Sequence, residues 1–192
     1  MATSNSILGN ALDVLREGQN LTIEAVAKRA GLTKPGVIHH FPGKEALTTA
    51  VVSRVMDLWE AELNSRVQKG AGDLDRLRAY IDFAFMADFD PSDLALLADT
   101  NLRDRLVENW IHRLEPWFGI TAGGNDAEQT ACRAARLMAD GAWFDRSLGL
   151  VCLGEAERRA TRDLALSLLR NVAQAQSNAI EGRGLAVEDA NL

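Results

Sequence analysis

Residues 31–47 read GLTKPGVIHHFPGKEAL, a stretch more polar and more often interrupted by glycine and proline than the chain around it. Thr33 is a suitable N-cap, and Pro35 fits the first turn of a helix, where its missing N–H costs nothing. The FPGK sequence then ends that helix after barely two turns. We therefore predict a very short helix that starts with small and polar residues.

Another short helix is predicted immediately before it. Thr22 is the expected N-cap, Glu24 favours the positive end of the helix dipole, and Gly31 stops the helix. Two short helices joined by a turn that contains glycine are typical of a helix-turn-helix, whose second helix enters the DNA major groove with its N-terminus first. A tight helical corner without DNA binding fits the same pattern, so the pattern alone leaves both interpretations open.

The rest of the chain is predicted to be helical as well. Apolar residues recur at helical spacing, and no sustained run of period two predicts a strand. The other expected helices cover residues 6–16, 44–69, 73–88, 91–100, 102–117, 126–149 and 154–177. We predict an all-α protein with a helix-turn-helix head at 1–48. A long fourth helix joins it to a larger helical domain at 49–177, and a tail follows at 178–192.

Charge and composition limit the possible partners. The 192 residues carry a net charge of −6, but residues 1–48 hold five basic and four acidic side chains, so a polyanion contact is expected only there. With no basic leader and no long apolar run, we expect a cytoplasmic protein without a membrane partner. Cys132 and Cys152 are expected to be reduced thiols, and neither they nor the adjacent His39 and His40 have partners at metal-ligand spacing. We therefore expect no metal and no cofactor.

The sequence TIEAVAKRAGLTKPGVIHHFPGKEAL, residues 22–47, is similar to the TetR/AcrR family of bacterial transcriptional regulators. The similarity covers roughly residues 7–52 and includes the Ala-Gly that ends the first short helix, the His-Phe that ends the second, and the Lys-Glu-x-Leu that follows. By this resemblance, Thr33, Lys34, Pro35 and Gly36 read base edges, and Thr22, His40 and Lys44 contact phosphates. The family usually has Tyr where this chain has Ile38, and His39 is our candidate to replace that contact.

The larger, acidic part of the chain is expected to form the dimer and to bind the ligand. Helices 126–149 and 154–177 carry wide apolar bands, which include Leu164 and Leu169 and need a second cover. The resemblance implies that they form a four-helix homodimer interface; a monomer with both bands internal is the alternative. The residues expected to line a cavity for a small apolar or aromatic effector are Trp59, Phe83, Met86, Trp110, Trp117 and Phe144, with a solid core as the alternative.

An enzyme is not expected. The chain has no G-x-S-x-G, no phosphate-binding loop, no Cys–His pair at motif spacing and no Glu-x-x-His pair. We predict a ligand-responsive regulator that binds double-stranded DNA. It is expected to act as a repressor that a small-molecule effector releases from a palindromic operator. The alternative is a helical small-molecule carrier that does not bind DNA.

Overall fold

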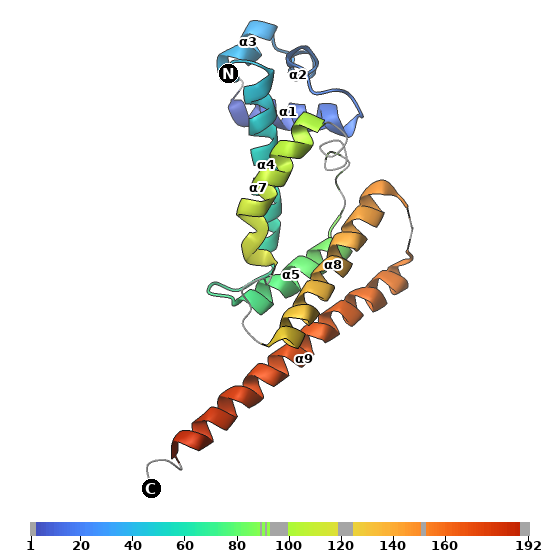
Figure 1. Cartoon of the computed structure of the whole chain (residues 1–192). Helices are drawn as coiled ribbons and strands as arrows, with labels where there is room; N and C mark the ends of the chain where they lie inside the picture. Colours follow the sequence, from blue (N-terminus) through green and yellow to red (C-terminus); the bar gives the residue numbers. More distant parts are fainter. Residues whose placement is uncertain are drawn as a thin grey trace. The chain divides into compact units, whose positions relative to one another are not determined.

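The computed structural model of this chain is entirely helical over the residues that it describes, which are 3–88, 90, 92, 100–118, 125–150 and 153–188. This confirms the predicted fold class. The helices are α1 Ser4–Arg16, α2 Ile23–Ala30, α3 Lys34–His40, α4 Lys44–Ser65, α5 Asp73–Met86, α7 Thr100–Leu114, α8 Asp126–Leu148 and α9 Glu155–Glu188, with a 3-10 turn at Glu115–Trp117 (Figure 1). The helix expected over 91–100 lies almost wholly outside the described residues.

Two helices end at places that the sequence pattern did not indicate. α4 stops at Ser65 rather than near residue 69. The N–H of Arg66 donates to the carbonyl oxygen of Leu63 at 3.0 Å, a tighter turn than an α-helix makes, and Gly70 at φ +87° lies further along the connection to α5. α9 runs past the expected end near residue 177 to Glu188. Residues 177–188 contain no proline, and each of the two glycines there costs only about 1 kcal/mol, too little to stop the helix.

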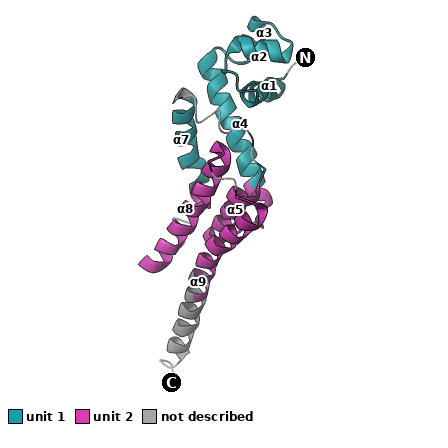
Figure 2. Ribbon diagram, turned by 90° about the vertical axis from the view of Figure 1, so that its right-hand side faces the viewer, with its two compact units in different colours: residues 1–62, 88–114 teal, residues 63–87, 115–192 magenta. Residues whose placement is uncertain are grey.

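The chain divides into two compact units (Figure 2). Unit 1 contains residues 1–62 and 88–114, and unit 2 contains residues 63–87 and 115–192. The boundary expected at residue 48 falls inside α4, which is one continuous helix from Lys44 to Ser65. The functional division at residue 48 stays a prediction, whereas the compact units divide near the end of α4.

In unit 1, the three short helices α1, α2 and α3 gather around the start of α4 (Figure 1). Their shared core includes Ile7, Val26, Val37 and Leu47, all of which are fully buried. Burial of this apolar surface gives α2 and α3 a stability that helices of eight and seven residues could not have alone.

Helix α7 is braced against α4 within the same unit. Arg113 donates hydrogen bonds to Glu60 Oε1 at 2.6 Å and to Asp57 Oδ1 at 2.7 Å, and it reaches the carbonyl oxygen of Ser53 at 3.3 Å. These contacts fix α7 along the middle of α4. The start and the middle of α4 therefore belong to one braced body with the helix-turn-helix.

In unit 2, helices α5, α8 and α9 pack together (Figure 1). The Tyr80 hydroxyl on α5 donates to Asp140 Oδ1 on α8 at 2.7 Å, and burial, followed by the nearby Asp140 charge, holds the pKa of Tyr80 well above its ordinary value. Arg146 of α8 donates to the carbonyl oxygens of Ala84 and Ala87, which lie at the end of α5. This charged side chain satisfies carbonyls that the helix itself leaves without a partner.

No helix in the described part of the chain has an apolar stretch long enough to cross a membrane.

Candidate nucleic-acid interface

The helix-turn-helix is built from two threonine caps and one glycine. Thr22 Oγ1 accepts a hydrogen bond from the N–H of Ala25 at 3.0 Å, and Thr33 Oγ1 accepts one from the N–H of Gly36 at 3.2 Å. Gly31 follows α2 with φ +65°, a conformation that an L-residue with a side chain adopts only at a cost. The chain therefore turns within three residues and begins α3, as the sequence predicts.

Helix α3 presents its first turn to solvent. Only Val37 is buried among its seven residues, and Thr33, Lys34 and Pro35 are exposed. Gly36 is half-buried, and a Cβ placed there would lie 3.3 Å from Thr33 Oγ1. A larger residue at this position would press on the hydroxyl that caps the helix. The four predicted base-reading residues thus share one surface, held in place by a single apolar anchor.

The predicted phosphate contacts lie at the ends of the same helices. His40 Nδ1 is 3.1 Å from the Ser4 hydroxyl oxygen, and the rings of His39 and His40 meet edge to face with centroids 5.4 Å apart. Lys44 is exposed and opens α4 directly after Gly43, which has φ +141°. A lysine beside the free N–H groups of a helix N-terminus is a chemically suitable phosphate site. Their roles on DNA stay predictions.

A cleft of about 580 Å³ lies next to Lys44 and contains more acidic than basic groups. The residues that line it are Lys44, Glu45, Thr48, Asp104, Arg105 and Glu108. Arg105 of α7 donates to Glu45 and, at 2.9 Å, to Thr49 Oγ1, so it binds α7 to the first turns of α4. The three carboxylates make this cleft unsuitable for a phosphate. We interpret its charged residues as contacts that hold α7 against α4.

Ion pairs on the head are the feature that sequence reasoning missed. Arg29 contacts Asp13 at 3.3 Å and Glu17 at 3.1 Å, while Lys34 pairs with Glu24 across α2 and α3. The first-turn positions of Glu24 and Lys34 were visible in the sequence, but their proximity depends on how α2 packs against α3. Within the described residues, no carboxylate pairs with Lys28 or Lys44. These two lysines are the basic groups of the head left without an ion pair.

Arg16, at the end of α1, is tied to a residue that precedes α7. Arg16 Nε lies 3.0 and 3.1 Å from the two carboxylate oxygens of Asp90, and a terminal nitrogen lies 2.6 Å from one of them. Asp90 also accepts hydrogen bonds from the N–H and the hydroxyl of Ser92 at 2.9 and 2.8 Å. Burial alone would raise the pKa of Asp90, but the hydrogen bonds from Arg16 and Ser92 outweigh it and the pKa is lowered.

The six predicted ligand residues do not gather in one described cavity. Trp59 and Trp110 meet edge to face in unit 1, with ring centroids 4.9 Å apart. The other four belong to unit 2, where Trp117 is buried, Phe83 and Met86 are half-buried and Phe144 is exposed. On α8 the neighbouring Trp143, rather than Phe144, is buried. The ligand role of all six stays a prediction.

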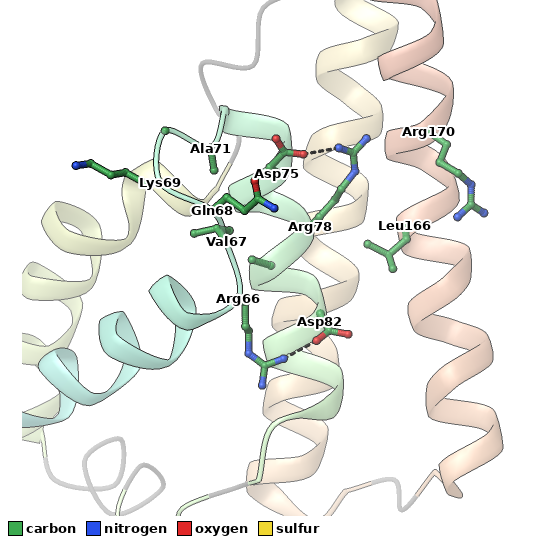
Figure 3. A pocket seen from close by; sticks show the side chains of 12 residues that line it. Arg66, Val67, Gln68, Lys69, Ala71, Asp75, Arg78, Asp82, Leu166 and Arg170 are labelled. Carbon is green, nitrogen blue, oxygen red and sulfur yellow. Dashed lines mark hydrogen bonds and ion pairs between the residues drawn. The ribbon is translucent and has the colours of Figure 1, made fainter.

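Unit 2 contains a cavity of about 850 Å³ between the connection that follows α4, helix α5 and helix α9 (Figure 3). None of the six predicted ligand residues lines it. Arg66, Lys69, Arg78 and Arg170 contribute four cations, whereas Asp75 and Asp82 contribute two carboxylates. Arg66 pairs with Asp82, and Arg78 pairs with Asp75, while the side chains of Lys69 and Arg170 extend from the rims (Figure 3). The lining therefore has an excess of positive charge.

No group of three or more His, Cys, Asp or Glu residues that could hold a metal ion occurs among the residues described. Cys132 is a buried free thiol, and burial raises its pKa, which makes it a weak metal ligand and a weak nucleophile. Cys152 lies outside the described residues.

Two known protein families match this chain. Residues 11–51 match the family described as bacterial regulatory proteins, tetR family, and residues 75–170 match the family described as tetracyclin repressor-like, C-terminal domain. The HTH-type transcriptional regulator RutR of Escherichia coli K12 is 35% identical over 66 residues, which are 33% of this chain and 31% of RutR. The chain thus spans about a third of the length of the curated relatives that it matches.

Solved structures share the fold at low sequence identity. The structure of a transcriptional regulator from Rhodococcus sp. RHA1 superposes with a TM-score of 0.68 at 19% sequence identity, and the match covers 87% of this chain and 96% of the Rhodococcus chain. FadR from Bacillus subtilis, solved with stearoyl-CoA, has a TM-score of 0.50 at 18% identity, covering 87% and 97%. One family match covers the helix-turn-helix and the other, over residues 75–170, covers half of the whole chain, so the protein belongs to the TetR family of bacterial transcriptional regulators, a class of DNA-binding proteins that are not enzymes.

Proposed function

We propose that this protein is a cytoplasmic repressor that binds a palindromic operator as a homodimer and leaves it when a small effector binds. The observation that carries the DNA contact is the first turn of α3, which is anchored by Val37 alone and exposes Thr33, Lys34 and Pro35. Residues that read bases must be free of the core, and these are. Lys44, at the start of α4, supplies the adjacent phosphate contact.

The test of this function is selection of DNA from the source genome. Purified protein is mixed with genomic fragments, retained fragments are sequenced, and binding to the enriched sequence is compared with a scrambled one by gel shift at two salt concentrations. A repressor of this kind should enrich one palindrome whose half-sites lie about 34–36 Å apart, one turn of DNA. Absence of any enriched sequence would favour the carrier that binds no DNA.

A homodimer is proposed because one head of two short helices reads too few bases for a unique genomic address. Of the two leucines that the sequence indicated on α9, Leu169 is 0% exposed within its own chain, so it belongs to the core and cannot report on a dimer. Large apolar side chains that are exposed on α8 and α9 fit better. They are Leu137 at 64%, Phe144 at 44%, Leu148 at 49% and Leu164 at 59% exposed.

The three large apolar residues that are exposed on α8 repeat at the spacing of one helix face. Leu137 and Phe144 are seven residues apart, and Leu148 follows four residues later, with the exposed Gly141 between them. A continuous apolar stripe with a small residue at its centre suits close packing against a symmetry-related helix. We therefore propose that α8 and α9 of two protomers form the four-helix interface.

The effector site is proposed to lie in unit 2. The aromatic residues predicted from the sequence suit an apolar or aromatic ligand, whereas the 850 Å³ cavity suits a ligand that also has an acidic group, because its cations outnumber its carboxylates. Tryptophan fluorescence and thermal shift with octanoate, octylamine and naphthalene distinguish these ligand classes. Octanoate should bind and octylamine should not. Any compound that binds saturably without lowering operator affinity is not the effector.

A further inference from the structure

An ion pair joins the first turns of α2 and α3. Lys34 Nζ donates a hydrogen bond to Glu24 Oε1, and the two side chains are 56% and 63% exposed. The hydrogen bond from Lys34 lowers the pKa of Glu24. Lys34, which is predicted to read a base, is therefore paired with a carboxylate in the free protein.

Stability does not account for this pair. An ion pair as exposed as this one contributes little to folding, because solvent screening and side-chain entropy offset the attraction. At the same time, Glu24 places a negative charge beside Lys34, on a surface proposed to meet a polyanion, where a carboxylate disfavours binding. The first turn of α2 and the Lys34 ammonium both favour this carboxylate in the free protein, and on DNA only a hydrogen-bond donor of the operator makes its presence favourable. The edges of the bases in the major groove offer donors only as the amino groups of cytosine and adenine.

We propose that Glu24 is a specificity-determining residue whose carboxylate accepts a hydrogen bond from the N4 amino group of a cytosine in the operator, while Lys34 donates to a neighbouring guanine. The inference rests on the proposed function, because it requires the first turn of α3 to enter the major groove. On other sequences the pair stays closed, Glu24 neutralises the charge of Lys34, and the carboxylate meets no donor. Glu24 thus favours one base and disfavours the others.

The chain offers a matched control. Glu17 pairs with Arg29 at 3.1 Å, and both side chains are 44% exposed. This pair joins the end of α1 to the last turn of α2 and does not involve α3. Replacing Glu17 or Glu24 by alanine changes the net charge of the head by the same amount, so a difference between the two variants reports on position and not on charge alone.

The experiment measures dissociation constants by fluorescence anisotropy for the operator selected by the wild type, for its single-base variants and for a scrambled duplex. Replacement of one cytosine of the operator should weaken binding of the wild type by roughly 5- to 150-fold. Glu24→Ala should lose this preference for cytosine and keep the wild-type base preferences at the other positions of the operator. Glu24→Ala should also bind the scrambled duplex more tightly, with a salt slope steeper by about 0.9, because Lys34 is free to contact a phosphate. Glu17→Ala should leave every base preference unchanged.

A second variant, Glu24→Gln, should move the preference at that position from cytosine toward adenine, because the amide matches the adenine edge. Retention of the cytosine preference by both Glu24 variants would overturn the inference, even if they bind scrambled DNA more tightly, since the carboxylate would then act by repulsion only. Loss of the same preference in Glu17→Ala would overturn it too. Failure of the wild type to enrich any sequence would instead contradict the proposed function.

Discussion

Replacement of Arg113 by methionine tests whether α7 braces the DNA-contacting helix. Arg113 and Glu60 are 24% and 29% exposed, and Arg113 makes its contacts to Glu60, Asp57 and Ser53 along α4. Hydrogen bonds to charged groups contribute about 1.5–3 kcal/mol each, whereas exposed ion pairs contribute about 0–1 kcal/mol. For a half-buried side chain with several such partners, we expect a loss of about 2 kcal/mol in the free energy of unfolding.

The assay is thermal and urea unfolding followed by circular dichroism. For a chain of this length, about 2 kcal/mol corresponds to a fall in Tm of roughly 4–8 °C. Arg103→Met is the matched control, because Arg103 lies on the same helix and, among the residues that the structure describes, pairs only with the neighbouring Asp104, at 3.7 Å; it should change stability by less than about 0.5 kcal/mol. Methionine keeps much of the apolar stem, so the loss reports mainly on the charged contacts.

A double-mutant cycle separates the pair from other effects. Glu60→Gln should lower the free energy of unfolding much less in the Arg113→Met background than in the wild type, because the arginine that Glu60 pairs with is already absent. The reasoning is refuted if Arg113→Met unfolds at the same temperature as Arg103→Met, or if the two substitutions at the pair are simply additive.

The remaining predictions concern pH, DNA and assembly. Asp90→Asn should lower the free energy of unfolding at pH 7 by about 1 kcal/mol, because Arg16 loses its carboxylate. Because the pKa of Asp90 is lowered in the folded protein, its carboxylate stabilises the wild type at pH values above the ordinary carboxyl range, and this stability is lost as the pH falls through the lowered pKa. Between pH 7 and 2, the free energy of unfolding of Asp90→Asn should therefore fall less steeply than that of the wild type. The same pH dependence in both proteins would contradict this prediction. Lys44→Ala should weaken binding to all DNA sequences alike and reduce the salt slope by about 0.9, whereas Lys34→Ala should also relax base preference; equal losses on operator and scrambled DNA for both variants would reject this division. Phe144→Asp should yield monomers with folded heads in sedimentation, and a variant that stays dimeric would place the interface elsewhere.

Local chemistry explains why the helix-turn-helix could be predicted from sequence. The caps at Thr22 and Thr33 and the left-handed Gly31 lie within a few residues of the features that they control, so the boundaries of α2 and α3 followed from adjacent residues. The all-α class followed from helical spacing in the same way. The end of α9 was less predictable, because no residue after 177 is a strong helix stop.

Contacts between distant helices could not be predicted, since spacing along one helix does not say which face meets which neighbour. The apolar band of α9 indicated that it needed two covers, but only the structure separates the buried Leu169 from the exposed Leu164. The aromatic residues likewise indicated a cluster, and the structure places Trp59 and Trp110 in a unit without the other four. The Lys34–Glu24 pair depends on helix packing and not on sequence separation.

The proposed function depends above all on sequence-specific DNA binding by the exposed first turn of α3. The most direct test is the ratio of dissociation constants for the selected operator and a scrambled duplex of the same length, measured by anisotropy at one physiological salt concentration. The operator should bind at least about 10³-fold more tightly than the scrambled duplex. Equal affinity for the two duplexes, or no binding to either, would contradict it.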